Sequence, residues 1–236
     1  MSPTSAVYAT AATRELALAA DRAFADAPPA QTLAWAARTF GSRLAVASSM
    51  ADEVVAHLAS QAAPGIAVLF LDTGYHFQQT LDFRADVARR LEVTVVDVTA
   101  EQTVAEQDLA YGANLYARDP DACCTVRKVF PLNAALEPYD AWISGVRRAE
   151  SAARAATPVV AWDEARGMIK INPIAGWSQD ELDAYVTQHG LRSNPLRELG
   201  FTSIGCAPCT RPVAPGEDPR AGRWAGFAKT ECGLHP

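Results

Sequence analysis

Short apolar runs alternate with helix-length amphipathic stretches through the middle of the chain, and this alternation constrains the fold more than any other feature of the sequence. The apolar runs cover residues 43–47, 66–71, 93–98 and 141–144. The amphipathic stretches between them cover residues 52–62, 76–91 and 121–137. Apolar runs flanked by helices are typical of strands that are buried on both faces of a sheet. The sequence therefore predicts an α/β fold, in which helices cover a parallel twisted sheet.

The chain is less regular on either side of this pattern. Alanine-rich stretches at 8–26 and 30–40 have helical periodicity and predict two N-terminal helices. Apolar stretches at 159–162 and 168–171 could form a small hairpin. The sequence Ser-Gln-Asp-Glu that follows has the form of a capping box and predicts a helix to about residue 188.

From Asn194 onward the chain is rich in Pro and Gly and has little periodicity. A long stretch without regular structure inside a compact protein is usually functional or disordered. The residue types found here, with several cysteines and arginines, favour a functional segment.

Composition and charge exclude several classes of function. The longest purely apolar run, at 66–71, is far shorter than the roughly 18 residues that suggest a membrane span. The N-terminus lacks a basic start followed by an apolar stretch, so it does not predict a secretory signal, and we expect a cytoplasmic protein. The formal net charge of −6 argues against a broad nucleic-acid surface. A few local cations would still be enough to bind a small anion.

Four of the five cysteines form two pairs. Cys123 and Cys124 are adjacent, and Cys206 and Cys209 form a Cys-Ala-Pro-Cys sequence. Taken alone, each pair has a plainer interpretation, as small core residues or as a redox dithiol. Together, four thiolates can hold a zinc ion or a [4Fe–4S] cluster. Adjacent side chains diverge, and a wide core with separate iron corners accepts them more easily than one ion does, so the spacing favours the cluster.

The fifth cysteine, Cys232, lies in the terminal sequence Thr-Glu-Cys-Gly-Leu-His-Pro. The simplest interpretation is an incidental surface thiol. Several cations close in sequence oppose it, because positive charge lowers the pKa of a thiol. They are Arg220, Arg223, Lys229 and His235. A mobile tail can also close over a substrate and open later to a partner, so Cys232 is predicted to be a nucleophile.

Seven motifs carry a family resemblance from about residue 43 to the end of the chain. They are ASSMADEV, FLDTGYHF, CCTVRKV, SGVRR, GCAPCTRPV, GRW and KTECGLH. In this order they resemble the cluster-containing adenylylsulfate (APS) reductases of assimilatory sulfate reduction, within the family that also reduces phosphoadenylylsulfate (PAPS). The resemblance implies a fold similar to the adenine-nucleotide α-hydrolase group. It also implies that APS and reduced thioredoxin are converted to sulfite, AMP and oxidised thioredoxin.

The same resemblance implies roles for individual residues. The [4Fe–4S] cluster would be bound by Cys123, Cys124, Cys206 and Cys209. The sulfur of the substrate's sulfate group would be attacked by Cys232. That sulfate would be surrounded by Lys128, Arg220, Arg223 and His235. The nucleotide would lie near Ser48, Ser49 and Arg147.

Residues near other expected strand ends are given less weight. Asp72 and His76 could contact a nucleotide, but Asp-Thr-Gly is also a plain turn and helix-cap sequence. Arg127 is interpreted as an ordinary solvated helix cation. ATP pyrophosphatases of this fold carry SGGxDS where this chain has Ser-Ser-Met-Ala-Asp, without glycine. Because glycine lets backbone amides approach phosphates, this loop predicts a nucleotide with one phosphate rather than a triphosphate.

We therefore expect three parts along the chain. They are N-terminal helices at 1–42, a nucleotide-binding α/β core at 43–193, and a largely irregular cluster-binding segment with a catalytic tail at 194–236. Two alternatives stay open: a reductase of PAPS or of both nucleotides, and a non-catalytic iron–sulfur or zinc nucleotide sensor. Reductases devoted to PAPS generally lack the cysteine pairs, so APS is favoured. The sequence leaves the oligomeric state open, a homo-oligomer included.

Overall fold

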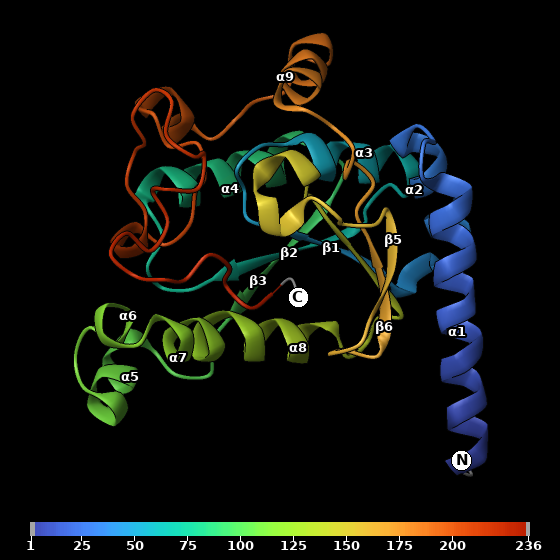
Figure 1. The fold of residues 1–236 in the computed structure, drawn as a ribbon, viewed down its shortest axis with the longest axis horizontal. Coiled ribbons are helices and arrows are strands. Elements are labelled where there is room, and N and C mark those ends of the chain that lie inside the picture. The colour runs from blue at the N-terminus through green and yellow to red at the C-terminus, as the bar shows by residue number, and fades with distance from the viewer. Residues whose placement is uncertain (1–2, 235–236) are drawn as a thin grey trace.

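The computed structural model describes residues 3–234, with side chains from residue 12 onward. A six-stranded sheet with the order β3-β2-β1-β4-β6-β5 forms its centre (Figure 1). The strands are β1 (Leu44–Ser48), β2 (Ala67–Asp72), β3 (Thr94–Thr99), β4 (Ala141–Ser144), β5 (Val160–Asp163) and β6 (Met168–Ile171). All neighbours pair in parallel except β5, which is antiparallel to β6 at the edge. The predicted parallel sheet is confirmed, and the predicted hairpin extends it.

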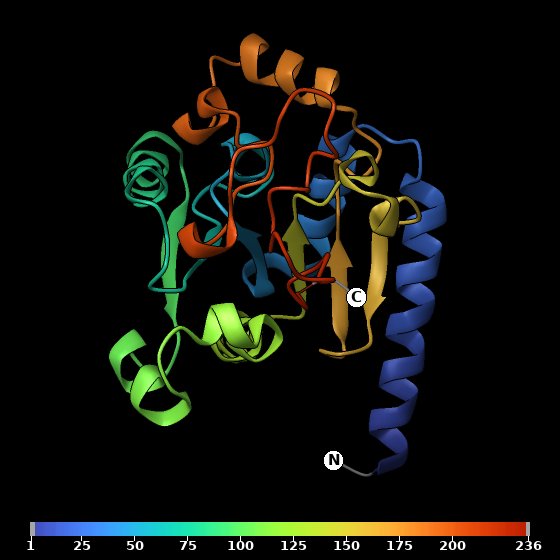
Figure 2. The same cartoon turned by 60° about the vertical axis from the view of Figure 1, so that its left-hand side comes forward.

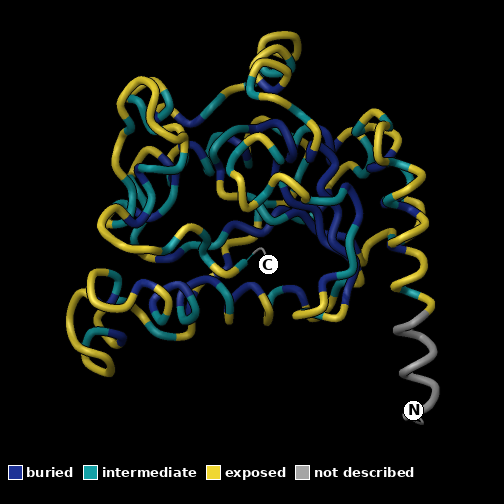
Figure 3. The backbone as a smooth tube through the Cα atoms, in the orientation of Figure 1, coloured by how far each residue is buried: buried dark blue, intermediate teal, exposed yellow. Residues whose placement is uncertain are grey.

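Helices cover both faces of the sheet because successive residues of each strand point to opposite sides. Val46 of β1 faces the larger core, which contains residues of α2 (Pro29–Phe40), α3 (Val54–Ala62) and α4 (Gln78–Arg90). Its neighbour Ala45 faces a second, smaller core under α8 (Phe130–Leu136). Every residue of β4 and β6 is buried, and both strands run through the dark blue centre of Figure 3.

The long helix α1 (Pro3–Phe24) packs along the edge of the sheet beside β5 (Figure 1). Ala17 and Ala20 of this helix belong to the larger core together with residues of the strands. The carboxylate of Asp21 accepts hydrogen bonds from the backbone N–H of Val159, at 2.8 Å, and from that of Val160, at 3.1 Å. The N-terminal helices before residue 42 and the α/β core after it therefore share one hydrophobic core.

The stretch predicted as one helix at 121–137 consists of three parts. α7 (Pro120–Cys124) leads into a π-helical turn (Thr125–Val129), and α8 follows directly. The N–H of Phe130 bonds to the carbonyl of Thr125, five residues earlier. The next residue is Pro131, which has no N–H for the helix ladder, so a widened turn before it is physically reasonable.

Two short helices, α5 (Val104–Tyr111) and α6 (Leu115–Arg118), precede α7 and were not predicted. The capping box at Ser178 does begin a helix as predicted, α9 (Gln179–Gln188). From there to residue 234 the chain forms short 3₁₀ helices, isolated bridges and loops, so the expected irregular segment is confirmed. No helix in the described part of the chain is both long and apolar enough to cross a membrane.

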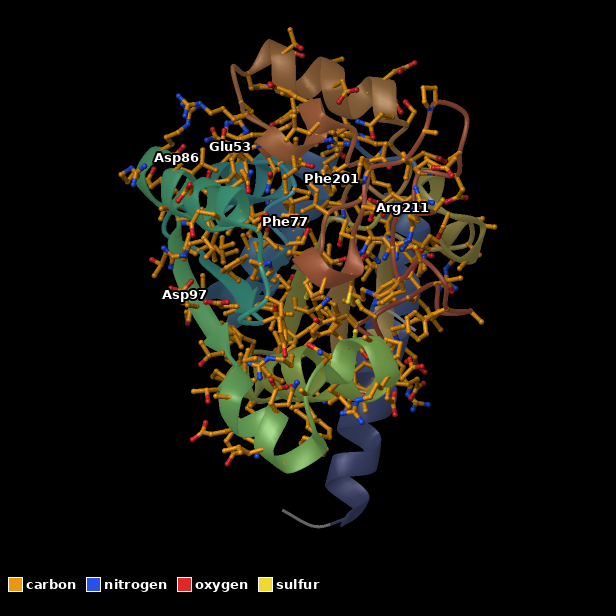
Figure 4. The ribbon with its side chains drawn as sticks, turned by 90° about the vertical axis from the view of Figure 1, so that its left-hand side faces the viewer. Glu53, Phe77, Asp86, Asp97, Phe201 and Arg211 are labelled. Carbon is orange, nitrogen blue, oxygen red and sulfur yellow. The ribbon has the colours of Figure 1, made fainter. Side chains whose placement is uncertain are left out.

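The irregular C-terminal segment crosses the face of the molecule where the parallel strands end (Figure 2). Phe201 packs edge to face on Phe77 at the start of α4, with ring centroids 5.3 Å apart (Figure 4). An isolated β-bridge between Thr210 and Arg223 folds the segment back on itself. At its end, Leu234 packs against the smaller core.

Candidate functional site

A cavity of about 670 Å³, here called the main cavity, opens at the carboxyl ends of the parallel strands. β1 lies between β2 and β4 in the sheet. The strands that follow β1 directly, β2 and β3, extend the sheet in one direction, and the later strands extend it in the other. In open α/β sheets, ligands bind in the crevice at such a switch point. Seven residues that the sequence assigned to a site line this cavity: Ser48, Ser49, Lys128, Arg147, Arg220, Arg223 and Cys232. His235 lies outside the described residues.

The loop after β1 forms one wall of the main cavity without any glycine. Met50 has a φ of 57° and therefore adopts the left-handed conformation that glycine would take most easily. Its N–H donates to the hydroxyl oxygen of Ser48 at 3.1 Å, and its side chain is fully buried. The hydroxyl of Ser48 and the burial of the Met50 side chain thus stabilise a turn that glycine would adopt more easily. Unlike glycine, Met50 has a Cβ, which lies beside the backbone amides.

On the β4 side of the cavity, Arg147 is buried and its guanidinium is held by α9. Its Nη2 donates to Oε1 of Gln179 at 2.8 Å. Asp52 lies on the same wall, where burial raises the pKa of its carboxyl although Arg197 opposes that effect. Arg147 is therefore a fixed cation near the ends of β1 and β4.

Asp72 and His76 follow β2. Asp72 forms the plain turn that the sequence indicated, since its carboxylate accepts from the N–H of Gly74 at 2.9 Å. His76 lines the cavity, and its Nε2–H donates to the carbonyl of Leu71 at 2.8 Å. Its Nδ1 is buried and has no partner among the described residues. Burial lowers the pKa of His76, so the neutral ring offers a hydrogen-bond acceptor to a ligand.

The four paired cysteines line one small cavity, here called the cysteine cavity, together with Lys128 and the ring of Trp224. The hydroxyl of Thr73 lies 3.2 Å from Sγ of Cys206. Burial raises the pKa of Cys123 to about 12, and the other three cysteines add to that effect. A positive inorganic core relieves this penalty, because metal binding deprotonates its thiol ligands. The donor set and its enclosure fit a thiolate-bound cluster.

Within residues 3–234, no group of three or more His, Cys, Asp or Glu side chains lies close enough to hold a single metal ion. A cubane cluster places a different demand on its ligands. Each thiolate binds its own iron atom, so the four sulfurs surround a core rather than meet at one point. The four paired cysteines line one cavity, which is a condition that such a set of ligands must meet.

Lys128 belongs to the wall that the two cavities share. The side chain is buried, which opposes its charge, but the electrostatic interactions with Cys206, Cys232 and Cys124 together outweigh burial, so the pKa of Lys128 is raised. Lys128 therefore carries a fixed positive charge between the paired cysteines and the terminal one.

Arg127, in contrast, was interpreted wrongly as a solvated cation. It is 4% exposed, and its Nε donates to the carbonyl of Thr73 at 2.5 Å. Its Nη1 donates to the carbonyl of Gln102 at 3.0 Å and lies 3.3 Å from Oε1 of Gln107. In the π turn both members of the Arg-Lys pair point inward. Arg127 fastens the turn to the loop after β2.

Two arginines of the C-terminal segment complete the cationic wall. Arg223 stacks on the ring of Trp224, 4.5 Å from its centroid, and its Nη1 lies 3.3 Å from the hydroxyl of Ser203. Its buried Nε has no partner in the described part of the chain. Burial and the nearby charges of Arg154 and Arg223 lower the pKa of Arg220. Such a crowded set of cations is suited to an anionic ligand.

Cys232 is partly buried and faces these cations in the main cavity. Two charged residues near it were not identified from the sequence. Lys170 is buried in β6 and interacts electrostatically with Cys232; burial lowers its pKa to about 8. Arg154 lines the cavity and pairs with Glu231 at 2.7 Å. A lysine inside the apolar strand Met-Ile-Lys-Ile was the available signal for the first, whereas Arg154 had none.

Comparison with known proteins gives a consistent assignment. Residues 43–212 match the phosphoadenosine phosphosulfate reductase domain. An adenosine 5'-phosphosulfate reductase of Streptomyces coelicolor is 57% identical to this chain over 98% of it and 99% of the relative. An alignment of this extent includes both cysteine pairs.

Solved structures agree on the fold. The crystal structure of a phosphoadenylyl-sulfate reductase from Candida auris, a phosphate complex, has a TM-score of 0.70 and 25% identity, covering 84% of this chain and 97% of the other. An NH3-dependent NAD synthetase from Campylobacter jejuni has a TM-score of 0.50 and 13% identity, covering 73% and 75%. The second likeness concerns the fold alone. The expected adenine-nucleotide α-hydrolase-like architecture is thus confirmed.

Proposed function

The chain belongs to the phosphoadenosine phosphosulfate reductase domain family, and from this membership we propose that it is an assimilatory adenylylsulfate reductase. It is an oxidoreductase that converts APS and reduced thioredoxin to sulfite, AMP and oxidised thioredoxin. The observation that carries the proposal is the main cavity, where Cys232 shares one space with Lys128, Arg220 and Arg223 at the switch point of the sheet.

The nucleotide part of APS fits the strand-end side of the main cavity. Ser48 and Ser49 offer hydroxyl groups there, and Arg147 offers a fixed cation. His76 offers an acceptor that suits a donor on the base or the ribose. The glycine-free loop leaves little backbone exposed for a triphosphate, which favours a nucleotide with one phosphate.

The sulfate end then lies toward the tail. The thiolate of Cys232 attacks the sulfur of the sulfate group, a sulfur–sulfur bond forms, and the bond from that sulfur to the bridging oxygen breaks. AMP leaves with the electron pair, and Cys232 carries an S-sulfonate. Negative charge grows on the departing phosphate, and preorganised cations stabilise such charge more than mobile water does. Arg220 and Arg223 can bind oxygens in pairs, whereas Lys128 acts as a point charge.

The second half of the reaction needs a dithiol. A thiolate of reduced thioredoxin attacks Sγ of Cys232, and sulfite leaves with the electron pair of the sulfur–sulfur bond. The mixed disulfide is resolved by the second thiol of thioredoxin, which ends as a disulfide and has supplied two electrons. Cys232 returns to its thiolate. Thioredoxin as the reductant, a cytoplasmic location and any homo-oligomer stay predictions.

We further propose that the cysteine cavity holds a [4Fe–4S] cluster bound by Cys123, Cys124, Cys206 and Cys209. Support comes from the convergence of two distant segments on one cavity. When bound, the cluster supplies a compact anionic charge. Lys128 stands between this charge and the main cavity, so it is held in its charged form close to where the sulfate would bind.

PAPS is the second candidate substrate, because the Candida auris neighbour is named for it. APS is favoured by the much higher identity, 57% against 25%, of the relative named for APS. Both names are those of enzymes, which argues against a non-catalytic sensor. Sulfite release measured with equal concentrations of APS and PAPS decides the matter. We expect APS to be preferred, and equal or higher rates with PAPS would overturn the assignment.

A further inference from the structure

The residue that precedes Cys232 holds the cavity arginines and the tail together. We propose that Glu231 is a latch: its carboxylate docks the tail on Arg154 and Arg220, and so positions Cys232 for attack. The proposal deepens the function proposed above and rests on it for the identity of the reaction. Glu231 is a positioning residue in this account, since it acts through Cys232 and the arginines.

Glu231 makes a bidentate ion pair with Arg154. Nε of Arg154 donates to Oε1 at 2.8 Å, and Nη2 donates to Oε2 at 2.7 Å. Nη2 of Arg220 donates to the same Oε2 at 3.1 Å. The side chains of Arg154, Glu231 and Arg220 are only 11%, 19% and 13% exposed. Parallel charge-assisted bonds in a partly dehydrated place fix geometry as well as charge.

The charges around Glu231 require an anion. Arg154, Arg220 and Arg223 all line the main cavity, and the positive charges of Arg154 and Arg223 lower the pKa of Arg220. A carboxylate beside them reduces this mutual repulsion. Burial raises the pKa of Glu231, but Arg154, Arg220 and Arg223 outweigh it, so the net shift is downward. Glu150 neutralises Arg154 from the other side, with Oε2 at 2.5 Å from Nη1. Removing Glu231 would leave Arg220 without a carboxylate partner in the described part of the chain.

Glu231 is not among the described residues that line the main cavity, although its two arginines are. Its carboxylate therefore binds the two arginines on the side that faces away from the cavity, and the side that faces the cavity stays open to a substrate. Consecutive Cα atoms are about 3.8 Å apart, so fixing Glu231 also fixes Cys232. Arg220 also donates to the backbone carbonyl of Thr230 at 2.9 Å, a bond that Glu231→Gln leaves in place. Two further anchors of the tail lie away from these arginines: Lys229 pairs with the exposed Asp121, and the carbonyl of Leu234 accepts from Arg166 at 3.3 Å.

A latch of this kind reconciles two demands on one segment. Attack on the sulfate requires Cys232 inside the main cavity, whereas the reductant requires access to its sulfur. Glu231 and its partners are partly exposed and joined only by hydrogen bonds and charge, so the tail can be released without unfolding the sheet.

The test compares Glu231→Gln with the control Glu217→Gln in the holoprotein. Glu217 lies in the same segment and also pairs with an arginine, Arg211, at 3.1 Å, but both side chains are exposed and neither lines the main cavity. Without substrate, we measure alkylation of Cys232 by iodoacetamide and tryptic cleavage after Lys229. Both should accelerate about tenfold in Glu231→Gln, the factor expected for loss of a charged hydrogen bond. They should keep the wild-type rate in Glu217→Gln.

The tryptic readout separates release of the tail from a change in thiol acidity, since trypsin does not sense the thiol. With saturating APS and no reductant, Glu231→Gln should also form the S-sulfonate about tenfold more slowly, because the nucleophile is less often in place. Glu231→Asp keeps the charge but is one carbon shorter, so it should recover part of both effects. This variant also serves if Glu231→Gln does not fold.

Wild-type rates of alkylation and cleavage in Glu231→Gln and Glu231→Asp would overturn the latch, as would equal acceleration in Glu217→Gln. These two readouts need no APS. If wild-type protein never acquires a sulfonate on Cys232, the proposed function fails, while the alkylation and cleavage rates still decide whether Glu231 holds the tail.

Discussion

At the scale of single residues, Gly205 shows how closely the cationic wall is packed. A Cβ at this position would lie 2.2 Å from Nη2 of Arg223 and 2.4 Å from its Cζ. Gly205→Ala should therefore displace the end of Arg223 and leave the backbone in place. We expect APS affinity to fall about tenfold, in line with loss of one charged hydrogen bond, with little change in thermal stability.

Gly176→Ala is the matched control for this substitution, because its Cβ would meet only Nη1 of Arg148 at an ordinary 3.8 Å. Equilibrium binding of APS to both variants checks the prediction. Wild-type affinity in Gly205→Ala would show that Arg223 does not touch the substrate.

His76 gives a prediction about pH. Burial lowers its pKa in the folded protein below the ordinary value of 6.5. A histidine whose pKa is lower in the folded than in the unfolded protein makes its full contribution to stability above pH 6.5. That contribution is lost as the pH falls below 6.5, because the unfolded chain then binds the proton more readily. His76→Phe removes the titrating ring and can still stack on Phe70, whose ring centroid is 4.8 Å from that of His76.

The midpoint of thermal unfolding of the holoprotein should therefore fall less steeply below pH 6.5 in His76→Phe than in the wild type. The slope should be reduced and not abolished, because burial and His189 lower the pKa of His57 as well. Identical slopes for the two proteins would contradict the buried, neutral state of His76.

At the scale of elements, the π turn between α7 and α8 depends on Arg127. Its guanidinium donates to two backbone carbonyls and to the side chain of Gln107. Arg127→Leu would leave these buried acceptors without a donor and should lower the free energy of unfolding by roughly 3 kcal/mol. Urea unfolding measures the difference.

Arg89→Gln is the control for Arg127→Leu. Arg89 is an arginine of α4 with 69% of its side chain exposed, and among the described residues its ion-pair partner is Asp86 of the same helix. Its loss should change the free energy of unfolding by no more than about 0.5 kcal/mol. Equal effects of the two substitutions would show that Arg127 does not hold the turn.

The elements that the sequence predicted well are those with an unambiguous periodicity. β1, β2 and β4 are largely buried runs of β-forming residues, and such runs leave few other structures open. β3 was predicted as a buried strand, but it lies at the edge of the sheet and only Val98 is buried. α5 escaped prediction because it is short and presents Leu109, 88% exposed, to solvent. The π turn also escaped, because ordinary helical periodicity places Arg127 outside.

At the scale of the whole molecule, the candidate site joins parts of the chain that only the fold brings together. Ser48 follows β1, Lys128 lies in the π turn, and Arg220 belongs to the irregular segment. Family motifs located these residues, but no local pattern states which of them face one cavity. The docking of Glu231 on Arg154 depends on a contact between segments 77 residues apart. Periodicity carries no information about such a contact, so it had to come from the structure.

The central claim is that the thiolate of Cys232 takes the sulfonate group from the substrate. Mass spectrometry of the protein after incubation with APS and without reductant tests it most directly. The account predicts one added SO₃ group on the peptide that carries Cys232, one AMP released per chain, and loss of the added group as sulfite when reduced thioredoxin is supplied. Sulfite formation with the peptide of Cys232 unmodified throughout would contradict it.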